Sequence, residues 1–246
     1  MCFRLRDIWR KSVTPVGDFP SLKHPNRRGY NWQMYNSGDR LLVENINYYL
    51  GDLYDLGCGE QPYRDWFLQY ADTYTGVDWA STFHELKADV VADLNHKLPI
   101  KDEVANTVVS LSVMEHLQEP QMFLNEAFRI LKPGGAMILQ VPFMWWVHEA
   151  PHDYYRYTAY GLKYLFEKAG FTRIEVSPQT GFWVMWVLKL NYQSLRLIRG
   201  PQVVRTLITA LLRVGWEVDQ RLAVWLDKYW KSEGESAGYC VLARKL

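Results

Sequence analysis

The sequence predicts an α/β fold in which helices cover a largely parallel sheet. Three observations predict it: short apolar segments alternate with stretches of helical periodicity, glycines follow the first of these segments, and acidic residues end the next two. Alternating strands and helices produce parallel strands joined by right-handed crossovers. The expected strands are residues 52–56, 74–78, 88–92, 107–112, 136–141, 172–177 and, after a long gap, 238–246.

The first expected strand ends in a glycine loop, residues 54–63, which read YDLGCGEQPY. Gly57 and Gly59 allow a tight turn and a close backbone approach to a ligand, and Asp55 brings a carboxylate into the same loop. A loop that holds phosphate would carry a lysine, or a third glycine opening a helix. The loop therefore indicates a cationic ligand.

Further motifs follow in order. The second strand ends in Asp78, about twenty residues beyond the glycine loop, where a carboxylate can accept hydrogen bonds from ribose hydroxyls. Residues 88–94 end with Asp93 and Leu94, and the strand at 107–113 leads into MEHL and then LKPGG at 131–135. With these four motifs, residues 52–177 resemble the class I S-adenosylmethionine-dependent methyltransferases, of the type found in bacterial glycan and glycolipid pathways.

The resemblance implies S-adenosyl-L-methionine as the cofactor. It places the glycine loop on the methionine side, Asp78 and the adjacent Trp79 at the ribose, Asp93 and Leu94 at the adenine, and Ser112 at the closing edge. The cofactor-binding residues expected are Asp55, Gly57, Cys58, Gly59, Arg64, Asp78, Trp79, Asp93, Leu94 and Ser112.

One departure from the family pattern concerns the methionine carboxylate. Gln61 stands where the family often has a third glycine. Arg64 is a candidate partner for that carboxylate because a guanidinium can bind it bidentately. The alternative is an arginine on the solvated face of a helix.

The fold that the resemblance implies is Rossmann-like: a seven-stranded, mostly parallel sheet with helices on both faces and one antiparallel final strand. Residues 37–246 form the methyltransferase domain, with a first helix at about 38–50. Residues 1–36 are expected to form an irregular arm because prolines and glycines are scattered through them, and this arm either packs on the core or closes over the cofactor. Thr158 and Gly170 are expected to cap a helix between them.

Composition restricts the class of protein. A chain of 246 residues with 48% hydrophobic content and a net charge of +1 suits one large α/β domain with additions. Near-neutrality argues against a nucleic-acid substrate. Cys2, Cys58 and Cys240 lie too far apart for a disulfide framework or a zinc site, so we expect a reducing cytoplasm. We expect neither a secretory signal nor a membrane span, because residues 1–13 lack an apolar core and no stretch has eighteen uninterrupted apolar residues.

A helical insertion is expected at about 181–234, before the last strand. No acidic residue occurs from Val176 to Trp216, whereas the same stretch contains five basic residues and many aromatics. Such a helix can lie on an anionic membrane through about residues 182–213, which would put the protein at the inner face of the membrane. The alternatives are a helical cap packed on its own core and a homodimer interface.

Catalytic residues are expected in the loop after the fifth strand, residues 143–157, since ligands of open α/β sheets bind beyond the carboxyl ends of strands. Methyl transfer requires a positioned acceptor and, for a hydroxyl, removal of its proton. His148 and His152 are the candidate bases, with Asp153 or Glu149 to orient an imidazole. We expect no metal, because Pro151 opposes the helix that would align His148 with His152.

The acceptor is expected to be a small molecule or a glycan. A sugar could stack on the ring of Trp145, Trp146 or a neighbouring tyrosine. A quinone or phenol would also suit these rings. The leading hypothesis is O-methylation of a saccharide or lipid-linked glycan hydroxyl. The alternatives are methylation of a quinone or phenol and a non-catalytic cofactor-binding subunit; an NAD enzyme is disfavoured because the loop lacks GxGxxG.

Overall fold

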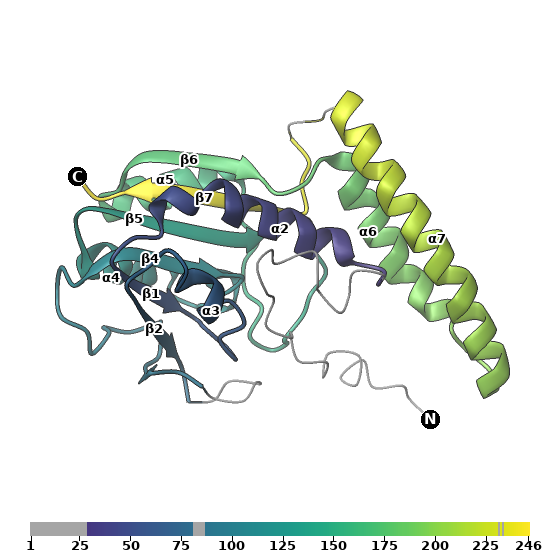
Figure 1. The fold of residues 1–246 in the computed structure, drawn as a ribbon, viewed down its shortest axis with the longest axis horizontal. Helices are drawn as coiled ribbons and strands as arrows, with labels where there is room; N and C mark the ends of the chain where they lie inside the picture. The colour runs from purple at the N-terminus through teal and green to yellow at the C-terminus, as the bar shows by residue number, and fades with distance from the viewer. Residues whose placement is uncertain (1–28, 81–86, 231, 233) are drawn as a thin grey trace.

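A single seven-stranded sheet forms the centre of the computed structural model, which describes residues 29–80, 87–230, 232 and 234–246 (Figure 1). The strand order is β3-β2-β1-β4-β5-β7-β6, and only β7 runs antiparallel to its neighbours. The strands are β1 Asp52–Leu56, β2 Thr73–Asp78, β3 Val90–Val91, β4 Ala105–Leu111, β5 Leu131–Pro142, β6 Thr172–Pro178 and β7 Gly238–Arg244. The predicted α/β fold is thus confirmed.

Two strands differ in length from their prediction. β3 is only two residues long because it is an edge strand that pairs with β2 alone, and few partners hold its flanks. β5 begins at Leu131, which pairs with Ala105. The pairing then shifts register around Gly134, whose φ of 82° makes the turn that lets the strand continue.

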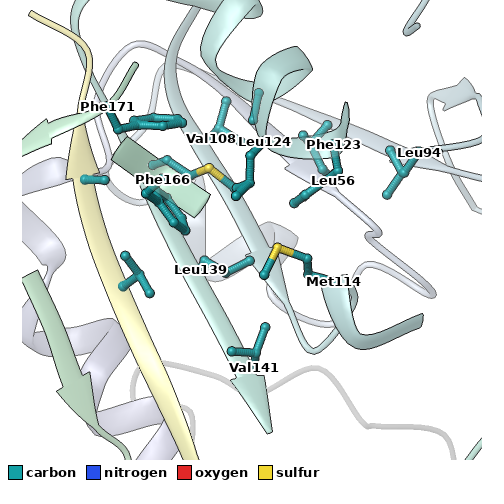
Figure 2. Packing of buried hydrophobic residues seen from close by; sticks show 14 of the residues in the cluster. Leu56, Leu94, Val108, Met114, Phe123, Leu124, Leu139, Val141, Phe166 and Phe171 are labelled. Carbon is teal, nitrogen blue, oxygen red and sulfur yellow. The ribbon is translucent and has the colours of Figure 1, made fainter. Parts of the chain in front are cut away.

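Helices cover both faces of the sheet. On one face α4 (Pro120–Ile130) and α5 (Ala159–Ala169) bury Phe123, Leu124 and Phe166 against Val108 and Leu139 (Figure 2). On the other face α2 (Trp32–Glu44) and α3 (Arg64–Phe67) contribute a second cluster of buried side chains. Its members include Leu41, Leu42, Tyr49, Trp66 and Phe67, packed on Leu53, Val109 and Ile138. The parallel strands are buried from both sides, as their apolar sequences require.

The expected caps of α5 are confirmed. Oγ1 of Thr158 accepts a hydrogen bond from the Gly161 amide at 3.0 Å, and Gly170 ends the helix with a φ of 99°.

The first helix begins earlier than the sequence pattern suggested. α2 starts at Trp32, so residues 32–36 are helical, while residues 1–28 of the expected irregular arm lie outside the described chain. Tertiary contacts stabilise this first turn: the Gln33 amide donates to Gln220 at 3.2 Å, and Asn191 donates to the Tyr30 carbonyl at 3.3 Å. Because both partners belong to the distant insertion, local sequence could not reveal them.

The insertion is a hairpin of two helices, α6 (Phe182–Ser194) and α7 (Gln202–Tyr229), with the short 3-10 helix η3 (Leu195–Leu197) after α6. It stands at one end of the molecule and extends beyond the sheet (Figure 1). The carboxylate of Asp227 on α7 accepts hydrogen bonds from the Gly181, Trp183 and Val184 amides at 2.8–3.1 Å, and so caps the start of α6.

Side-chain hydrogen bonds join the two ends of the insertion. The Thr180 amide donates to Oγ of Ser236 at 3.0 Å, and the Ala237 amide donates to Oγ1 of Thr180 at 2.9 Å. Within the described part of the chain, no helix combines the length and apolarity needed to cross a bilayer.

Candidate functional site

The switch point of the sheet lies between β1 and β4. The chain runs from β1 outward to β2 and β3, then crosses back to place β4 on the other side of β1. In open α/β sheets the crevice beyond the carboxyl ends of two such strands binds the ligand. Most of the predicted cofactor residues lie at or just beyond the ends of β1 to β4, and the predicted catalytic loop follows β5.

The glycine loop turns back across the end of β1. Gly57 and Gly59 have φ values of 88° and 51°, which glycine adopts without steric cost. A Cβ at Gly57 would lie 2.3 Å from Cγ2 of Val113, whereas a Cβ at Gly59 would meet no atom of the described chain within 4 Å. Gly57 therefore serves the packing of the loop, and Gly59 borders open space.

One carboxylate bonds to this loop, and a second joins the strands on which the loop rests. Oδ2 of Asp78 accepts the Gly59 amide at 2.7 Å, and Oδ2 of Asp55 accepts the Tyr74 hydroxyl at 2.6 Å. Asp55 is buried, and this burial raises its pKa to about 7 against the opposing effect of the Tyr74 hydrogen bond. Tyr74, which no sequence motif singles out, thus fixes the acid that distinguishes this loop from a phosphate loop.

Gln61 takes the left-handed conformation that a glycine usually supplies, with a φ of 56°. Its side chain compensates by donating to the Lys87 carbonyl at 2.6 Å and accepting from Nη1 of Arg64 at 2.7 Å. Arg64 also pairs with Asp89 at 3.1 Å. Arg64 therefore braces the loop against the start of β3, and its role toward a methionine carboxylate stays a prediction.

The remaining predicted cofactor residues lie along the same edge. Asp93 accepts the Asn95 amide at 2.9 Å, Leu94 is buried, and Ser112 follows β4 with a φ of 57°. Cys58 is buried beneath the loop, and burial raises its pKa to about 12, so it remains a neutral thiol.

The hydrogen-bond acceptors along this edge fit S-adenosylmethionine. Asp55, Asp78 and Asp93 are acceptors suited to hydroxyls, amines and a nearby positive charge, and the space beside Gly59 would admit a ligand against bare backbone. No lysine lies in the glycine loop to bind a phosphate.

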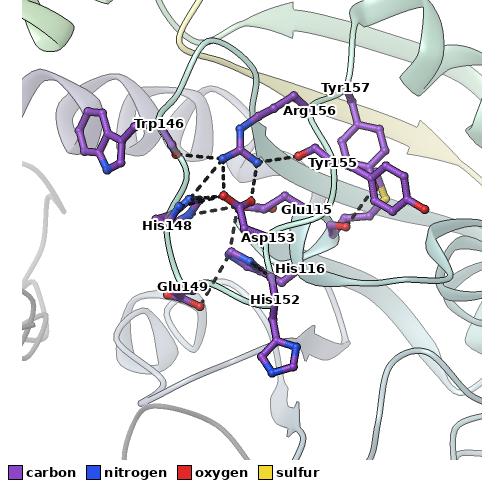
Figure 3. A network of polar contacts seen from close by, with 11 residues as sticks. Glu115, His116, Trp146, His148, Glu149, His152, Asp153, Tyr155, Arg156 and Tyr157 are labelled. Atoms are coloured by element: carbon purple, nitrogen blue, oxygen red, sulfur yellow. Dashed lines mark hydrogen bonds and ion pairs between the residues drawn. The ribbon is translucent and has the colours of Figure 1, made fainter.

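The loop after β5 forms a polar cluster (Figure 3). Asp153 binds Arg156 through both oxygens at 2.6 and 2.7 Å and accepts the His148 amide at 2.8 Å. Burial alone would raise the pKa of Asp153, but these hydrogen bonds outweigh burial and lower it to about 2. Nδ1 of His148 lies 3.4 Å from the same carboxylate. The structure thus joins two of the three predicted catalytic residues.

His148 is mostly buried, with 11% of its side chain exposed. Its pKa is lowered, first by burial and then by the neighbouring His116, so the imidazole is neutral at neutral pH. A neutral imidazole near an acceptor site can take a proton.

His152 lies apart from this pair and points away from the cluster (Figure 3). Its ring meets that of Trp79 edge-on at 5.4 Å, and Nδ1 lies 3.1 Å from the Tyr154 hydroxyl. Asp153 therefore orients His148 only, while the contact with Trp79 brings the catalytic loop to the end of β2.

Glu115 and His116, which belong to the MEHL segment after β4, also lie in the cluster. Both lie on the short helix η2 (Met114–His116) after β4, and Nε2 of His116 lies 3.6 Å from Oε1 of Glu115. Glu115 is fully buried, which raises its pKa to about 8, and neither carboxylate oxygen has a hydrogen-bond partner among the described residues. The available signal was their position, directly beyond the strand nearest the switch point.

Aromatic rings extend the site toward the hairpin. Trp146 is stacked between Trp145 and Tyr192, with ring centroids 3.8 Å apart on each side. Both faces of Trp146 are therefore covered, and the expectation that it could stack on a sugar is wrong. A groove of about 230 Å³ lies beside this stack, lined by Trp145, Trp146, Lys189, Tyr192 and Gln193.

Comparison with known proteins gives an independent test. Residues 54–139 match the methyltransferase domain family. A probable S-adenosylmethionine-dependent methyltransferase of Mycolicibacterium smegmatis is 32% identical over 97 residues, which cover 37% of this chain and 38% of that protein. A ubiquinone biosynthesis O-methyltransferase of Maricaulis maris is 33% identical over 95 residues, covering 34% of this chain and 37% of that protein.

These matches span less than two-fifths of either relative's length. Among solved structures, an S-adenosylmethionine-dependent methyltransferase from Archaeoglobus fulgidus shares the fold, with a TM-score of 0.54, 17% identity and coverage of 87% of this chain and 94% of that one. Residues 54–139 therefore match a methyltransferase domain, and the sheet that contains them shares its fold with that S-adenosylmethionine-dependent methyltransferase.

Proposed function

We propose that this protein is an S-adenosylmethionine-dependent methyltransferase that methylates a hydroxyl oxygen of a glycan acceptor. One observation supports this most: the cofactor-type acids of β1 to β3 and the His148–Asp153 pair lie at the same edge of one sheet. When bound, the cofactor supplies a methyl group on a sulfonium, which needs no further activation. The protein must then place the acceptor and deal with its proton.

The protein's own residues divide this work. Asp78 and the glycine loop hold the cofactor side, and the acceptor hydroxyl is activated at His148, which Asp153 holds in place. The Tyr154 amide donates to the Glu115 carbonyl at 2.9 Å, and the Tyr157 hydroxyl donates to the Met114 carbonyl at 3.0 Å. These bonds fix the loop to the end of β4, so His148 keeps a defined position.

The groove beside Trp145 supports a saccharide acceptor. A sugar can place its apolar face on an aromatic ring, and Lys189 and Gln193 supply donors for its hydroxyls. A quinone or phenol is the second candidate, because two matched relatives are ubiquinone biosynthesis O-methyltransferases.

The test measures cofactor and acceptor separately. Calorimetry should show binding of S-adenosylmethionine and S-adenosylhomocysteine but not NAD, and Asp78→Ala should abolish it. Mass spectrometry of glycolipid, free-glycan and phenol panels should then show a gain of one methyl group, lost in His148→Ala while cofactor binding persists. Preference for NAD would refute the proposal; binding without any methyl transfer would favour a non-catalytic subunit.

We also propose that the tip of the hairpin, residues 196–213, docks on an anionic membrane. This would be the cytoplasmic side, where a lipid-linked glycan would be presented. The tip carries Arg196, Arg199, Arg205 and Arg213 in a region without acids. A groove of about 350 Å³ there is lined by Arg205, Arg213, Thr206 and Thr209, among others, which suits a phosphate headgroup.

Apolar side chains accompany these charges. On α7 an exposed stripe runs with a spacing of three or four residues through Val204, Leu207, Leu211, Val214 and Val218. Leu211 is 74% exposed, which is costly in water unless something covers it. Arginines beside an apolar stripe complement an anionic lipid surface in both charge and polarity.

Vesicle sedimentation tests the docking. The protein should bind phosphatidylglycerol vesicles and not phosphatidylcholine vesicles at low salt. The double variant Arg205→Ala and Arg213→Ala should bind about 30-fold more weakly, at about 1 kcal/mol for each basic group. Lys163→Ala, an exposed lysine on α5, is the matched control and should bind normally. A dimer that Leu211→Ser dissociates, without vesicle binding, would overturn the proposal in favour of a second copy.

A further inference from the structure

Three potential ligands converge beside the loop after β5. Oε1 of Glu115 lies 3.6 Å from Nε2 of His116 and 3.9 Å from Nε2 of His148, and one ligand atom from each of the three side chains falls within 4.8 Å of the others. Two histidines and one carboxylate form a donor set that binds divalent transition metals and leaves further positions open. Figure 3 shows the three side chains arriving from two segments, the end of β4 and the catalytic loop.

The far side of each imidazole has a polar partner. Nδ1 of His116 lies 2.6 Å from the His152 carbonyl oxygen, so it carries the proton and Nε2 presents its lone pair toward Glu115. Nδ1 of His148 lies 3.4 Å from both the Asp153 carboxylate and Nη2 of Arg156, so a metal on its Nε2 would require the proton to lie on Nδ1, toward the carboxylate. An imidazole that donates from one nitrogen to a carbonyl or carboxylate, and faces a shared centre with the other, is the usual arrangement of a metal-binding histidine.

The charges of the cluster also favour a cation. Glu115, Glu149 and Asp153 surround it, and Arg156 is the positive partner of Asp153 through a bidentate pair. Oε2 of Glu149 lies 3.7 Å from Nε2 of His116, within reach of the same centre. The Glu115 oxygens are buried and find no hydrogen-bond donor among the described residues, an arrangement that is costly without a cation or a proton.

We propose that Glu115, His116 and His148 bind a divalent transition-metal ion of the zinc and cobalt type. Tetrahedral zinc with bonds of about 2.0 Å sets its ligands about 3.3 Å apart. Oε1 of Glu115 already lies 3.6 and 3.9 Å from the two imidazole nitrogens, and the widest separation in the set, within 4.8 Å, would have to close by up to about 1.5 Å. The sequence argument against a metal concerned His148 with His152, and the structure instead gives His148 a partner from the end of β4.

The role of the ion rests on the proposed function. It would lie at the carboxyl edge of β4 and β5, where an acceptor hydroxyl could take an open coordination position. Because the cation lowers the pKa of that hydroxyl, the hydroxyl would release its proton to solvent, in place of direct transfer to His148. His148 would then act as a ligand, and Asp153 as the residue that orients it.

Cobalt titration tests the site without any enzymatic turnover. Protein treated with a chelator and dialysed should bind one Co²⁺ per chain, seen as visible ligand-field absorption, and Zn²⁺ should displace it. Glu115→Gln, His116→Ala and His148→Ala should abolish the absorption. His152→Ala removes a histidine of the same loop but keeps the carbonyl that holds His116, so it should bind Co²⁺ normally.

Asp153→Asn gives the finer test. It removes the carboxylate behind His148 and should weaken Co²⁺ binding by about 10- to 100-fold, the usual effect of losing such a partner. Circular dichroism checks that each variant is folded. Glu115→Gln is nearly isosteric, so it remains informative if a histidine variant fails to fold.

The outcomes separate the two proposals. No absorption, or full Co²⁺ binding by Glu115→Gln and His148→Ala, overturns the metal site and leaves the methyltransferase proposal standing. Co²⁺ binding that needs all three side chains, in a protein that transfers no methyl group, supports the site and refutes the proposed activity.

Discussion

Single residues in the glycine loop have separable roles. At Gly57 an added Cβ would overlap Val113, so Gly57→Ala should lower the free energy of unfolding by more than the ~1 kcal/mol cost of its positive φ alone. Gly59→Ala carries the same conformational cost but no clash. It should remain folded and bind S-adenosylhomocysteine at least about tenfold more weakly. Chemical denaturation and calorimetry on both variants test this; equal affinity loss with equal destabilisation would contradict it.

A buried acid on α2 sets a pH dependence of stability. Asp39 is 1% exposed, and burial raises its pKa to about 7 against the opposing hydrogen bond from Tyr63. The folded protein therefore retains a proton that the unfolded chain releases above about pH 4. Stability contributed by protonated Asp39 is present below pH 4 and is lost as the pH rises to about 7.

Asp39→Asn should remove this part of the pH dependence. Compared with the natural protein, the variant should gain on the order of 1 to 4 kcal/mol at pH 8 and show a flatter profile between pH 4 and 7. Urea denaturation at several pH values measures it. Parallel profiles for the two proteins would show that Asp39 is ionised without cost.

Among the elements, the hairpin contains an interhelical cap. Asp227 accepts three amides at the start of α6, so Asp227→Ala should leave those amides unpaired and cost about 1 to 3 kcal/mol. Hydrogen exchange should become faster in the first turn of α6 and remain unchanged in α4. Asp227→Asn keeps one acceptor oxygen and should show a smaller effect. Unchanged exchange in both variants would rule out the cap.

Elements with local signals could be predicted from sequence, and those with tertiary causes could not. The strands β1 and β2 follow from apolar runs that end in glycine or acid, and α5 follows from Thr158 and Gly170. The start of α2 could not be predicted, because contacts with Asn191 and Gln220 stabilise it. In the site, His148 and Asp153 are close in sequence, whereas Glu115 and His116 reach them only through the pairing of β4 with β5.

For the whole molecule, the sheet and the hairpin should respond separately to ligands. S-adenosylhomocysteine at 100 times its Kd should raise the free energy of unfolding by about 2.7 kcal/mol. Protection from hydrogen exchange should increase at the ends of β1, β2 and β4 and not in the outer half of α7. Binding to anionic vesicles should instead increase protection in the outer half of α7 and not at the ends of β1, β2 and β4. Protection of α7 by the cofactor alone would show that the two regions are coupled.

The hydrogen bonds among Thr180, Ser236 and Ala237 have a consequence for how such a protein can diversify. They close the base of the insertion, so the chain leaves β6 and returns to β7 at nearly one place. A segment with adjacent ends can be exchanged for a longer, shorter or different one with little disturbance to the strands it joins. Grafting another hairpin between these residues would therefore be expected to redirect the protein to a new location or acceptor while the cofactor chemistry is inherited unchanged.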